Sequence, residues 1–268
     1  MKQTAIRVLA LAAAVLVVIL IHRRVEFEAA EAERLVTEAA EQGHGALADE
    51  RRSLSVLRIG DGAALGRVTE NTELGGIDLT VTAADGTETT YTFTDVPADA
   101  WFVNAVNYAV STGLMTGVEG QSLFRPEYGV QREMFASVLY RFVGGEPVEA
   151  DNRFEDISEG AWYRDAVLWA TENGCLTPLE SGRFGVGEFI TCEQALVGLY
   201  RIAGEPETDG LLTDYPYAAK VSEYGHNAID WAWKNELITE DECVWYPPQA
   251  ISRAQVALLL MRFSEKIS

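Results

Sequence analysis

The sequence predicts a mainly α fold of three tandem helix-pair repeats, preceded by an N-terminal hydrophobic helix and a small β-hairpin region. Two kinds of landmark recur about every 60 residues. One is an alanine within an apolar stripe, 61 and 62 residues apart at Ala105, Ala166 and Ala228. The other is an arginine, 60 and 61 residues apart at Arg141, Arg201 and Arg262. A fixed period with the same landmarks indicates one supersecondary unit that buries its apolar face against its neighbours.

The recurring landmarks and the changes in composition along the chain divide it into six segments. They are a signal-anchor or transmembrane segment (1–24), a helical spacer (25–52), a small β region (53–92) and three repeats (93–145, 146–205 and 206–268). A chain of 268 residues is long enough for one or two domains with a substantial core.

The N-terminal segment has the pattern of a membrane anchor. Residues 8–21 are an unbroken apolar run, preceded by Lys2 and Arg7. As a helix this run is about 21 Å long, short of a hydrocarbon core of roughly 30 Å. Counted from Thr4, with Arg7 extended toward the interface, it becomes long enough. A small-x-small cleavage site does not directly follow, which favours an uncleaved anchor, with a cleaved signal as the alternative.

The segments before the repeats change character near residue 53. Residues 25–52 are rich in Ala and Glu, which indicates a mostly solvated helix broken near Gly43 and Gly45. Residues 77–81 then alternate apolar and polar side chains, and a second such run follows at 89–93. Asp85-Gly86 lies between the two runs, and this pair is typical of a hairpin turn. We expect a β-hairpin here and a weaker strand at 54–59.

Each repeat is expected to form two helices joined by a loop. In the first repeat, one apolar stripe recurs at helical spacing and ends at Gly113, a natural C-cap; its members are Trp101, Phe102, Ala105, Val106, Ala109 and Val110. A second stripe comprises Met134, Phe135, Val138, Leu139 and Phe142. Between the stripes, Phe124-Arg125-Pro126 indicates an irregular turn, because proline disfavours a helix before it.

Composition excludes several classes of function. The formal net charge of −20 argues against nucleic acid as a partner, since that binding needs a basic surface. Three cysteines (Cys175, Cys192 and Cys243) do not form a disulfide framework or a Cys-x-x-Cys pair, and the three histidines are scattered. We therefore expect buried free thiols, no metal site and no cofactor.

The second helix of each repeat begins at a segment that could carry binding chemistry. It reads Val-Gln-Arg-Glu-Met at 130–134, Ile-Thr-Cys-Glu-Gln at 190–194 and Ile-Ser-Arg-Ala-Gln at 251–255. Thr191 with Gln194, and Ser252 with Gln255, fit a capping box. Capping does not account for an arginine at the first helical position, where the helix dipole disfavours a cation. Such an arginine is suited to an anion, although a structural role for Arg132 and Arg253 remains open.

These features together resemble the S-layer homology family, the wall-anchoring modules of bacterial surface proteins. The resemblance covers residues 93–263 and rests on ordered pieces: a Phe-x-Asp-Val start at Phe93, a Trp near the first helix, a Gly-x-Phe-x-Pro-like turn and the segment beginning at Val130. The second and third repeats are degenerate. Cys192 replaces the arginine in the second, and the third has Tyr224 for Trp and lacks the Gly-x-Phe turn.

The resemblance implies a three-pronged pseudo-trimer whose inter-repeat grooves bind secondary cell-wall polysaccharide, often through a pyruvylated sugar carrying a carboxylate. Its implied glycan-binding residues are Arg132, Arg253, Trp101, Trp162, Glu133, Glu193 and Gly117. We expect Arg132 and Arg253 to be exposed and to point into open grooves. Asp95, Asp156 and Asp214 are expected to hold a helix or a turn. With Cys192 in place of an arginine, at most two grooves are expected to be competent.

The sequence therefore favours a non-catalytic cell-surface module, located outside the cytoplasm in the cell envelope and attached to membrane by its N-terminal segment. The alternative is a degenerate scaffold that mediates protein–protein interaction at the envelope without binding glycan. An enzyme such as a glycan hydrolase needs a positioned carboxylate pair. Residues 53–92, the stretch outside repeats, anchor and spacer, are too short for a catalytic domain.

Overall fold

The computed structural model describes residues 65–180 and 182–267. The expected anchor (1–24), spacer (25–52) and strand (54–59) lie outside these residues. Leu179 and Glu180 group with a separate compact unit, and every element below belongs to the unit of residues 53–178 and 182–268. Within the described residues, none of the helices has the length and apolar character needed to cross a membrane.

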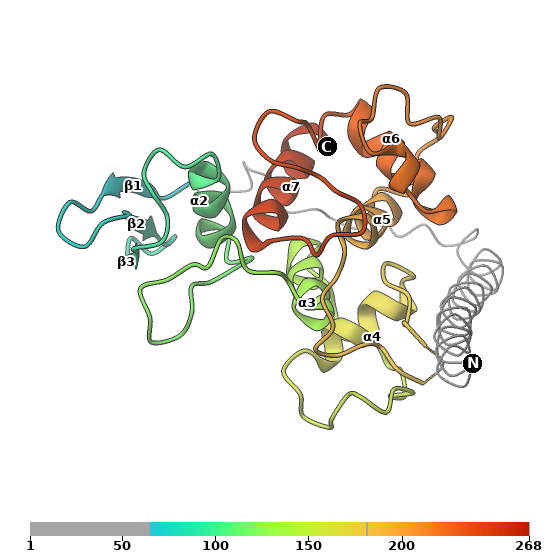
Figure 1. Ribbon diagram of the computed structural model, residues 1–268. Helices are drawn as coiled ribbons and strands as arrows, with labels where there is room; N and C mark the ends of the chain where they lie inside the picture. The colour runs from blue at the N-terminus through green and yellow to red at the C-terminus, as the bar shows by residue number, and fades with distance from the viewer. Residues whose placement is uncertain (1–64, 181, 268) are drawn as a thin grey trace, which may run out of the picture. The chain divides into compact units, whose positions relative to one another are not determined.

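A three-stranded antiparallel sheet precedes the helices, in the order β1-β2-β3 (Figure 1). Its strands are β1 (Arg67–Glu70), β2 (Ile77–Thr82) and β3 (Glu88–Phe93). The β2–β3 turn contains Gly86 at φ 85°, a conformation that glycine adopts without steric cost. Ile77 and Leu79 are fully buried on one face of β2, as the alternating pattern requires. β1 was not predicted from the sequence.

The sheet is fixed to helix α2 (Val103–Ser111) by a small polar network. Asn107, a buried residue of α2, donates from Nδ2 to the carbonyl of Gly66 at 2.8 Å. The amide of Gly66 donates to Ser111 Oγ at 2.9 Å, and that hydroxyl donates to Asn107 Oδ1 at 2.8 Å. Because buried polar groups are costly when unpaired, this closed set explains an asparagine in an otherwise apolar helix face.

Five further α-helices follow: α3 (Arg132–Phe142), α4 (Arg164–Glu172), α5 (Cys192–Ile202), α6 (His226–Lys234) and α7 (Arg253–Lys266). Two short 3-10 turns, η1 (Ala218–Lys220) and η2 (Glu223–Gly225), precede α6. α3 packs on α4, α5 packs on α6, and α7 packs on α2 (Figure 1). Each packed pair therefore joins the second helix of one predicted repeat to the first helix of another.

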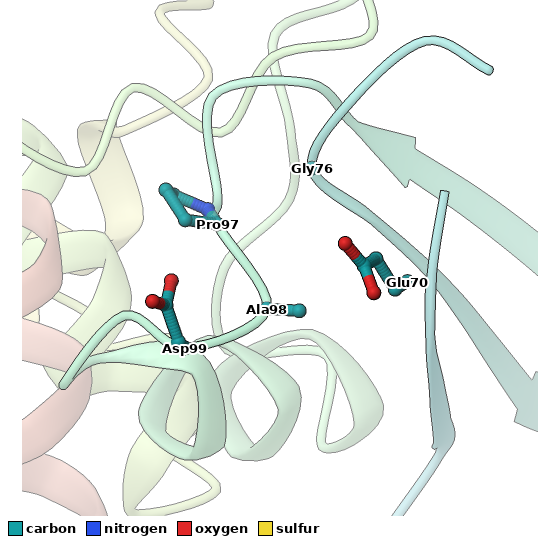
Figure 2. Close-up of a pocket in the computed structure, with 5 residues that line it drawn as sticks. All are labelled: Glu70, Gly76, Pro97, Ala98 and Asp99. Atoms are coloured by element: carbon teal, nitrogen blue, oxygen red, sulfur yellow. The ribbon is translucent and has the colours of Figure 1, made fainter. Parts of the chain in front are cut away.

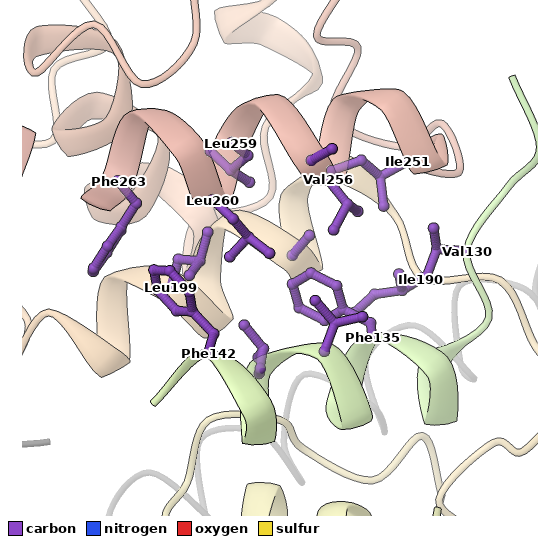
Figure 3. Close-up of a cluster of buried hydrophobic side chains, with 14 of the residues drawn as sticks. Val130, Phe135, Phe142, Ile190, Leu199, Ile251, Val256, Leu259, Leu260 and Phe263 are labelled. Atoms are coloured by element: carbon purple, nitrogen blue, oxygen red, sulfur yellow. The ribbon is translucent and has the colours of Figure 1, made fainter. Parts of the chain in front are cut away.

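Three extended residues, one before each second helix, are joined in a closed hydrogen-bonded cycle. The amide of Val130 donates to the carbonyl of Ile251 at 2.9 Å, that of Ile251 to Ile190 at 3.0 Å, and that of Ile190 to Val130 at 3.0 Å. Their side chains are buried, and residues from α3, α5 and α7 gather around them, among them Phe135, Leu199 and Leu260 (Figure 3). Segments about 60 residues apart thus share one core.

The repeated arginine closes each repeat internally. Arg141, on α3, donates from Nη1 to the carbonyl of Leu114 just after α2, at 2.6 Å. Arg201 donates to Gly174 at 3.0 Å, and Arg262 donates to Leu237 at 3.3 Å. Carbonyls at a helix C-terminus lack partners within the helix, so a guanidinium there satisfies them and complements the helix dipole.

Candidate functional site

Two aspartates hold the turns that lie between the helices of the first two repeats. Asp95 accepts hydrogen bonds from the amides of Phe124 at 2.8 Å and Arg125 at 2.7 Å. Asp156 accepts from the amides of Phe184, Gly185 and Val186, at 2.9, 2.7 and 2.9 Å. Burial alone would raise the pKa of Asp156, but these backbone bonds outweigh burial and lower the pKa.

The start of each second helix lies beside these turns. Thr191 and Ser252 each form a complete capping box with the glutamine three residues later, so that prediction is confirmed. α3 differs, because Gln131 is its N-cap residue and donates from its side chain to the carbonyl of Gly187 at 3.2 Å. The arginine or cysteine that follows is the first residue of its helix, as the sequence indicated.

Arg132 is buried between the first and second repeats, with 2% of its surface exposed. Its Nε donates to the carbonyl of Phe184 at 2.9 Å, and its terminal nitrogens donate to the carbonyl of Thr177 and to Gln194 Oε1. The guanidinium also lies 4.8 Å from the ring centre of Phe184. Burial, which disfavours the charged form, lowers the pKa of Arg132 to about 10.

Arg253 makes equivalent backbone and ring contacts between the predicted third repeat and the first repeat. Its Nε donates to the carbonyl of Phe124 at 2.8 Å, and Nη2 donates to the carbonyl of Thr116 at 2.6 Å. Its guanidinium lies 4.6 Å from the ring centre of Phe124. Phe124 precedes Arg132 by eight residues, and Phe184 precedes Cys192 by the same interval, so the two contacts are equivalent by repeat.

The expectation that Arg132 and Arg253 are exposed and point into open grooves is wrong. Arg132 is buried and Arg253 is half-buried, and both guanidinium groups donate to backbone carbonyls of a neighbouring repeat. The physical reason is that the loop between each threonine and the following Phe presents carbonyls that helices and strands do not use. A planar guanidinium satisfies several such acceptors together.

At the boundary between the second and third repeats, Cys192 takes the place of the arginine. Its side chain is 1% exposed, and burial raises the pKa of this thiol to about 12, so it is neutral. The carbonyl equivalent to that of Phe124 and Phe184 belongs to Trp245, eight residues before Arg253. The hydroxyl of Tyr215 donates to it. Tyr215 follows Asp214, just as Val96 follows Asp95 and Ile157 follows Asp156. The tyrosine in place of an aliphatic residue was therefore visible in the sequence.

The glutamate that follows Arg132 and the one that follows Cys192 also form hydrogen bonds across repeat boundaries. Glu133 is 6% exposed and accepts from the amide of Gly187 at 3.0 Å. Glu193 is 4% exposed and accepts from the amide and hydroxyl of Ser222, at 2.7 and 2.9 Å, and from the hydroxyl of Tyr224 at 3.3 Å. Both carboxylates therefore have partners in the next repeat along the chain, which was not expected from the sequence.

Each repeat has an aromatic side chain near its start, and the three differ in solvent accessibility. Trp162 is 66% exposed, and its ring meets that of Tyr163 edge-on at 5.3 Å. Trp101 is half-buried and packs edge-on against Phe102 at 5.1 Å. Tyr224 is 41% exposed, but its hydroxyl is bonded to Glu193. Among the predicted site residues, Trp162 is thus the one with a largely open aromatic face.

Tyr163 was missed by sequence reasoning and lies beside Trp162. Burial raises its pKa most, and the charges of Glu133 and Asp156 raise it further. Glu133 belongs to the first repeat, so this electrostatic interaction links residues of the first and second repeats. The signal was available, because a second aromatic follows the tryptophan in both of the first two repeats.

Gly117 has a packing role. A Cβ atom there would lie 2.7 Å from the ring of Phe93, closer than a side chain can approach, and 3.0 Å from the carbonyl of Leu123, a tight contact. The residue therefore permits close approach of the turn to the end of β3. This contact accounts for the glycine without a ligand.

A hollow lies between the sheet and the loop that leads into α2. It has a volume of about 440 Å³ and is lined by Glu70, Gly76, Pro97, Ala98 and Asp99. Figure 2 shows Glu70 on the β1 side and Asp99 on the loop that leads into α2. Its two carboxylates do not meet a third ligand, and within the described residues no group of three acidic, histidine or cysteine side chains is placed to hold a metal.

Comparison with known proteins gives the chain a family context. Residues 92–135 and 153–196 match the model of the S-layer homology domain. The surface-layer 125 kDa protein of Lysinibacillus sphaericus is 25% identical over 170 residues, which is 61% of this chain and 14% of that protein. The S-layer protein of Bacillus thuringiensis subsp. finitimus is 29% identical over 114 residues, or 41% of this chain and 14% of that protein.

The S-layer protein sap of Bacillus anthracis is 27% identical over 115 residues, again 41% of this chain and 14% of that protein. The aligned part of this chain thus spans a small fraction of each of these relatives. The resemblance to the S-layer homology family is confirmed for the first two repeats, while a third, degenerate repeat stays a prediction from the sequence.

Proposed function

We propose that this chain is a non-catalytic cell-surface module that anchors to the cell wall by binding wall polysaccharide between its repeats. Two segments match a domain family named for surface layers, and the similar proteins are themselves surface-layer proteins. The ionisable groups at the repeat boundaries are engaged in structural hydrogen bonds, which suits a binding role better than acid–base chemistry.

The architecture that we propose for this function is a closed pseudo-trimer of three repeats. Packing of α7 on α2, together with the hydrogen-bonded cycle of Val130, Ile190 and Ile251, supports closure of the third repeat onto the first. Such closure creates three inter-repeat boundaries from a linear array. In this arrangement the third repeat contributes a boundary on each side, whether or not it binds ligand itself.

The single observation that carries the glycan proposal is the open indole of Trp162. It packs edge-on against Tyr163, and the charge of Glu133, a residue of the first repeat, acts on the pKa of that tyrosine. A flat aromatic face covers the apolar C–H face of a sugar ring, while nearby hydroxyl and carboxylate groups bond sugar hydroxyls. We place the main glycan site here, and secondary contacts at Trp101 and Glu193.

In this proposal Arg132 and Arg253 have a structural role, whereas the sequence led us to expect that they bind the ligand. Arg132 holds the turn at Phe184 and so fixes the wall of the groove, because its donors already have carbonyl acceptors. A pyruvyl carboxylate on the sugar would have to compete for Arg132 or Arg253 with those carbonyls. The Trp162 contact does not depend on a ligand charge. Whether pyruvyl groups add affinity is tested separately, by comparing polysaccharide with and without them.

The test is calorimetric titration of purified wall polysaccharide, with and without its pyruvyl groups, into the chain. Trp162→Ala removes an aromatic anchor, which typically costs about 2 kcal/mol or more, or roughly 30-fold in affinity. Leu211→Ala is the matched control, since Leu211 is 71% exposed and lies in the third repeat. Equal affinity of the wild type and Trp162→Ala would remove the site, and no binding to any wall fraction would remove the glycan function.

The alternative is a protein-binding scaffold, which a different surface favours. Tyr128 and Phe189 are each 48% exposed and pack edge-on at 6.1 Å, next to the hydrogen-bonded cycle. Exposed paired aromatics are typical of protein interfaces. Failure of glycan binding, together with capture of an envelope protein that Phe189→Ala abolishes, would favour this alternative.

We also propose that residues 1–24 attach the module to membrane. Support comes from the apolar run at 8–21 and its basic flanks. N-terminal sequencing of the native protein tests this proposal. A mature chain that begins beyond Arg24 would contradict it.

A further inference from the structure

A second, smaller cavity lies within the third repeat. Its volume is about 60 Å³. It is bounded by the loop after Asp214, the end of α6 and the segment that follows α6, and its lining residues are Tyr215, Pro216, Tyr217, Trp233, Thr239, Glu240, Cys243, Val244 and Trp245. The residues proposed above to bind glycan are not among them.

The walls of this cavity are aromatic and steeply inclined to one another. The rings of Tyr215 and Trp233 are 5.4 Å apart at 69°, and those of Tyr215 and Tyr217 are 6.0 Å apart at 79°. These edge-to-face contacts join the three rings into one aromatic wall. The hydroxyl of Tyr215 already donates to the carbonyl of Trp245, so its ring remains as its contribution to the wall.

The aromatic character is specific to the third repeat. Tyr215 corresponds to Val96 and Ile157, and Trp233 corresponds to Val110 and Thr171, by their places next to the aspartate and alanine landmarks. The third repeat has therefore lost S-layer homology features while gaining aromatic residues at two positions that face this cavity. Divergence of a degenerate repeat does not by itself explain why both of these aromatic side chains line the same cavity.

The charged side chain in the lining of the cavity is acidic, and the nearby Arg262 is paired with Glu242. Of the described residues that line it, Glu240 is the one with a formal charge, and it is exposed. Burial raises the pKa of the Cys243 thiol to about 11, so Cys243 is neutral near pH 7. The whole chain carries a formal net charge of −20, which attracts cations and repels anions over longer range.

We propose that this cavity binds a small organic cation, a methylated ammonium group. Aromatic faces attract such cations through the ring quadrupole, and several rings around one ammonium group form a cage. A water needs about 10–15 Å³, so a cavity of this volume has room for roughly four to six heavy atoms. A trimethylammonium group has five non-hydrogen atoms including the next carbon, and Glu240 contributes a carboxylate to the lining.

The test is calorimetric titration of choline chloride into the full chain, against sodium chloride at the same ionic strength. The matched ligand is 3,3-dimethyl-1-butanol, which has the same shape and no charge. We expect saturable choline binding, and binding of the alcohol about 2- to 30-fold weaker, the range of a cation–π contact. Equal affinities, or no saturable binding of choline, would overturn the assignment.

Two variants locate the cation. Trp233→Leu removes one wall and should weaken choline binding by a similar factor. Glu240→Gln alters an exposed side chain, so the variant should fold normally and bind choline about 1.4- to 5-fold less tightly. Glu119→Gln, an exposed acid elsewhere, is the control that should leave choline affinity unchanged. Choline binding indifferent to both cavity variants would place the cation elsewhere. Because these titrations contain no polysaccharide, they are independent of the glycan proposal.

Discussion

The guanidinium of Arg132 lies 4.8 Å from the ring centre of Phe184 and donates from Nε to the backbone carbonyl of that same residue. One side chain thus holds both the ring and the backbone of the neighbouring repeat's turn. Arg253 does the same to Phe124. The arginines in this chain therefore join repeats to one another, and their first effect is on stability.

Arg132→Ala should lower the free energy of unfolding by about 2–4 kcal/mol. The change removes charge-assisted hydrogen bonds, typically worth about 1.5–3 kcal/mol, and leaves the carbonyls of Phe184 and Thr177 without a donor. Urea unfolding followed by tryptophan fluorescence measures the loss. Arg153→Ala is the control, because that side chain is 57% exposed and its surface ion pair contributes at most about 1 kcal/mol. Equal effects of the two changes would contradict a buried clamp.

Cys192→Arg should destabilise the wild-type background. Cys192 is buried, and Tyr215 already donates to the carbonyl that the arginine would need. Tyr215→Val recreates the small residue found at Val96. Overpacking typically costs about 1–3 kcal/mol, so the double variant should recover part of that loss. A double-mutant cycle by urea unfolding measures the coupling; strictly additive effects would show that the two side chains do not share one site.

Glu193→Gln should also destabilise the fold, by about 1–3 kcal/mol. The carboxylate accepts three hydrogen bonds from Ser222 and Tyr224, and a carboxamide has only one acceptor oxygen. Tyr224→Phe removes one of these bonds and should cost less. Thermal unfolding of both variants ranks them. A larger effect of Tyr224→Phe would mean that the glutamate is held by other groups.

The effect of Asp156→Asn should depend on pH. Because its backbone bonds lower the pKa of Asp156 in the folded state, its carboxylate contributes stability above the unfolded pKa, about 3.9, and this contribution is lost as pH falls through the folded value. The variant should thus be less stable than wild type at pH 7, and the difference should shrink below about pH 4. Urea midpoints of both proteins from pH 7 to pH 3 provide the measurement. A constant difference would assign the effect to packing.

Truncation after Glu205 should lower the unfolding midpoint sharply. It removes α7 from α2 and leaves Val130 without its acceptor on Ile251. Residues of α2 such as Ala105 and Val106, fully buried in the intact chain, then lose cover. Differential scanning calorimetry compares the two chains. A cooperative transition at an unchanged midpoint would contradict closure of the three repeats.

Local features of this protein followed from its residues alone. The apolar stripes place helices where α2 and α3 lie, and the hydroxyl-x-x-Gln pattern gave the capping boxes of Thr191 and Ser252. These depend on contacts within a few residues, which periodicity and capping rules describe. The short strand β1 was not predicted, since its pairing with β2 and its bonds to α2 are decided by partners elsewhere in the chain.

Sequence by itself determined the 60-residue period, the helix starts and the family resemblance of the first two repeats. Tertiary structure alone decided which helices pack together and what the arginines at those starts do. Local rules leave a guanidinium at a helix N-terminus free to meet an anion. In the folded chain, Arg132 and Arg253 instead meet carbonyls of a neighbouring repeat, 52 and 129 residues distant along the chain at Phe184 and Phe124. Those acceptors become neighbours only when the repeats pack, and an unpaired buried carbonyl is costly enough to draw the guanidinium inward.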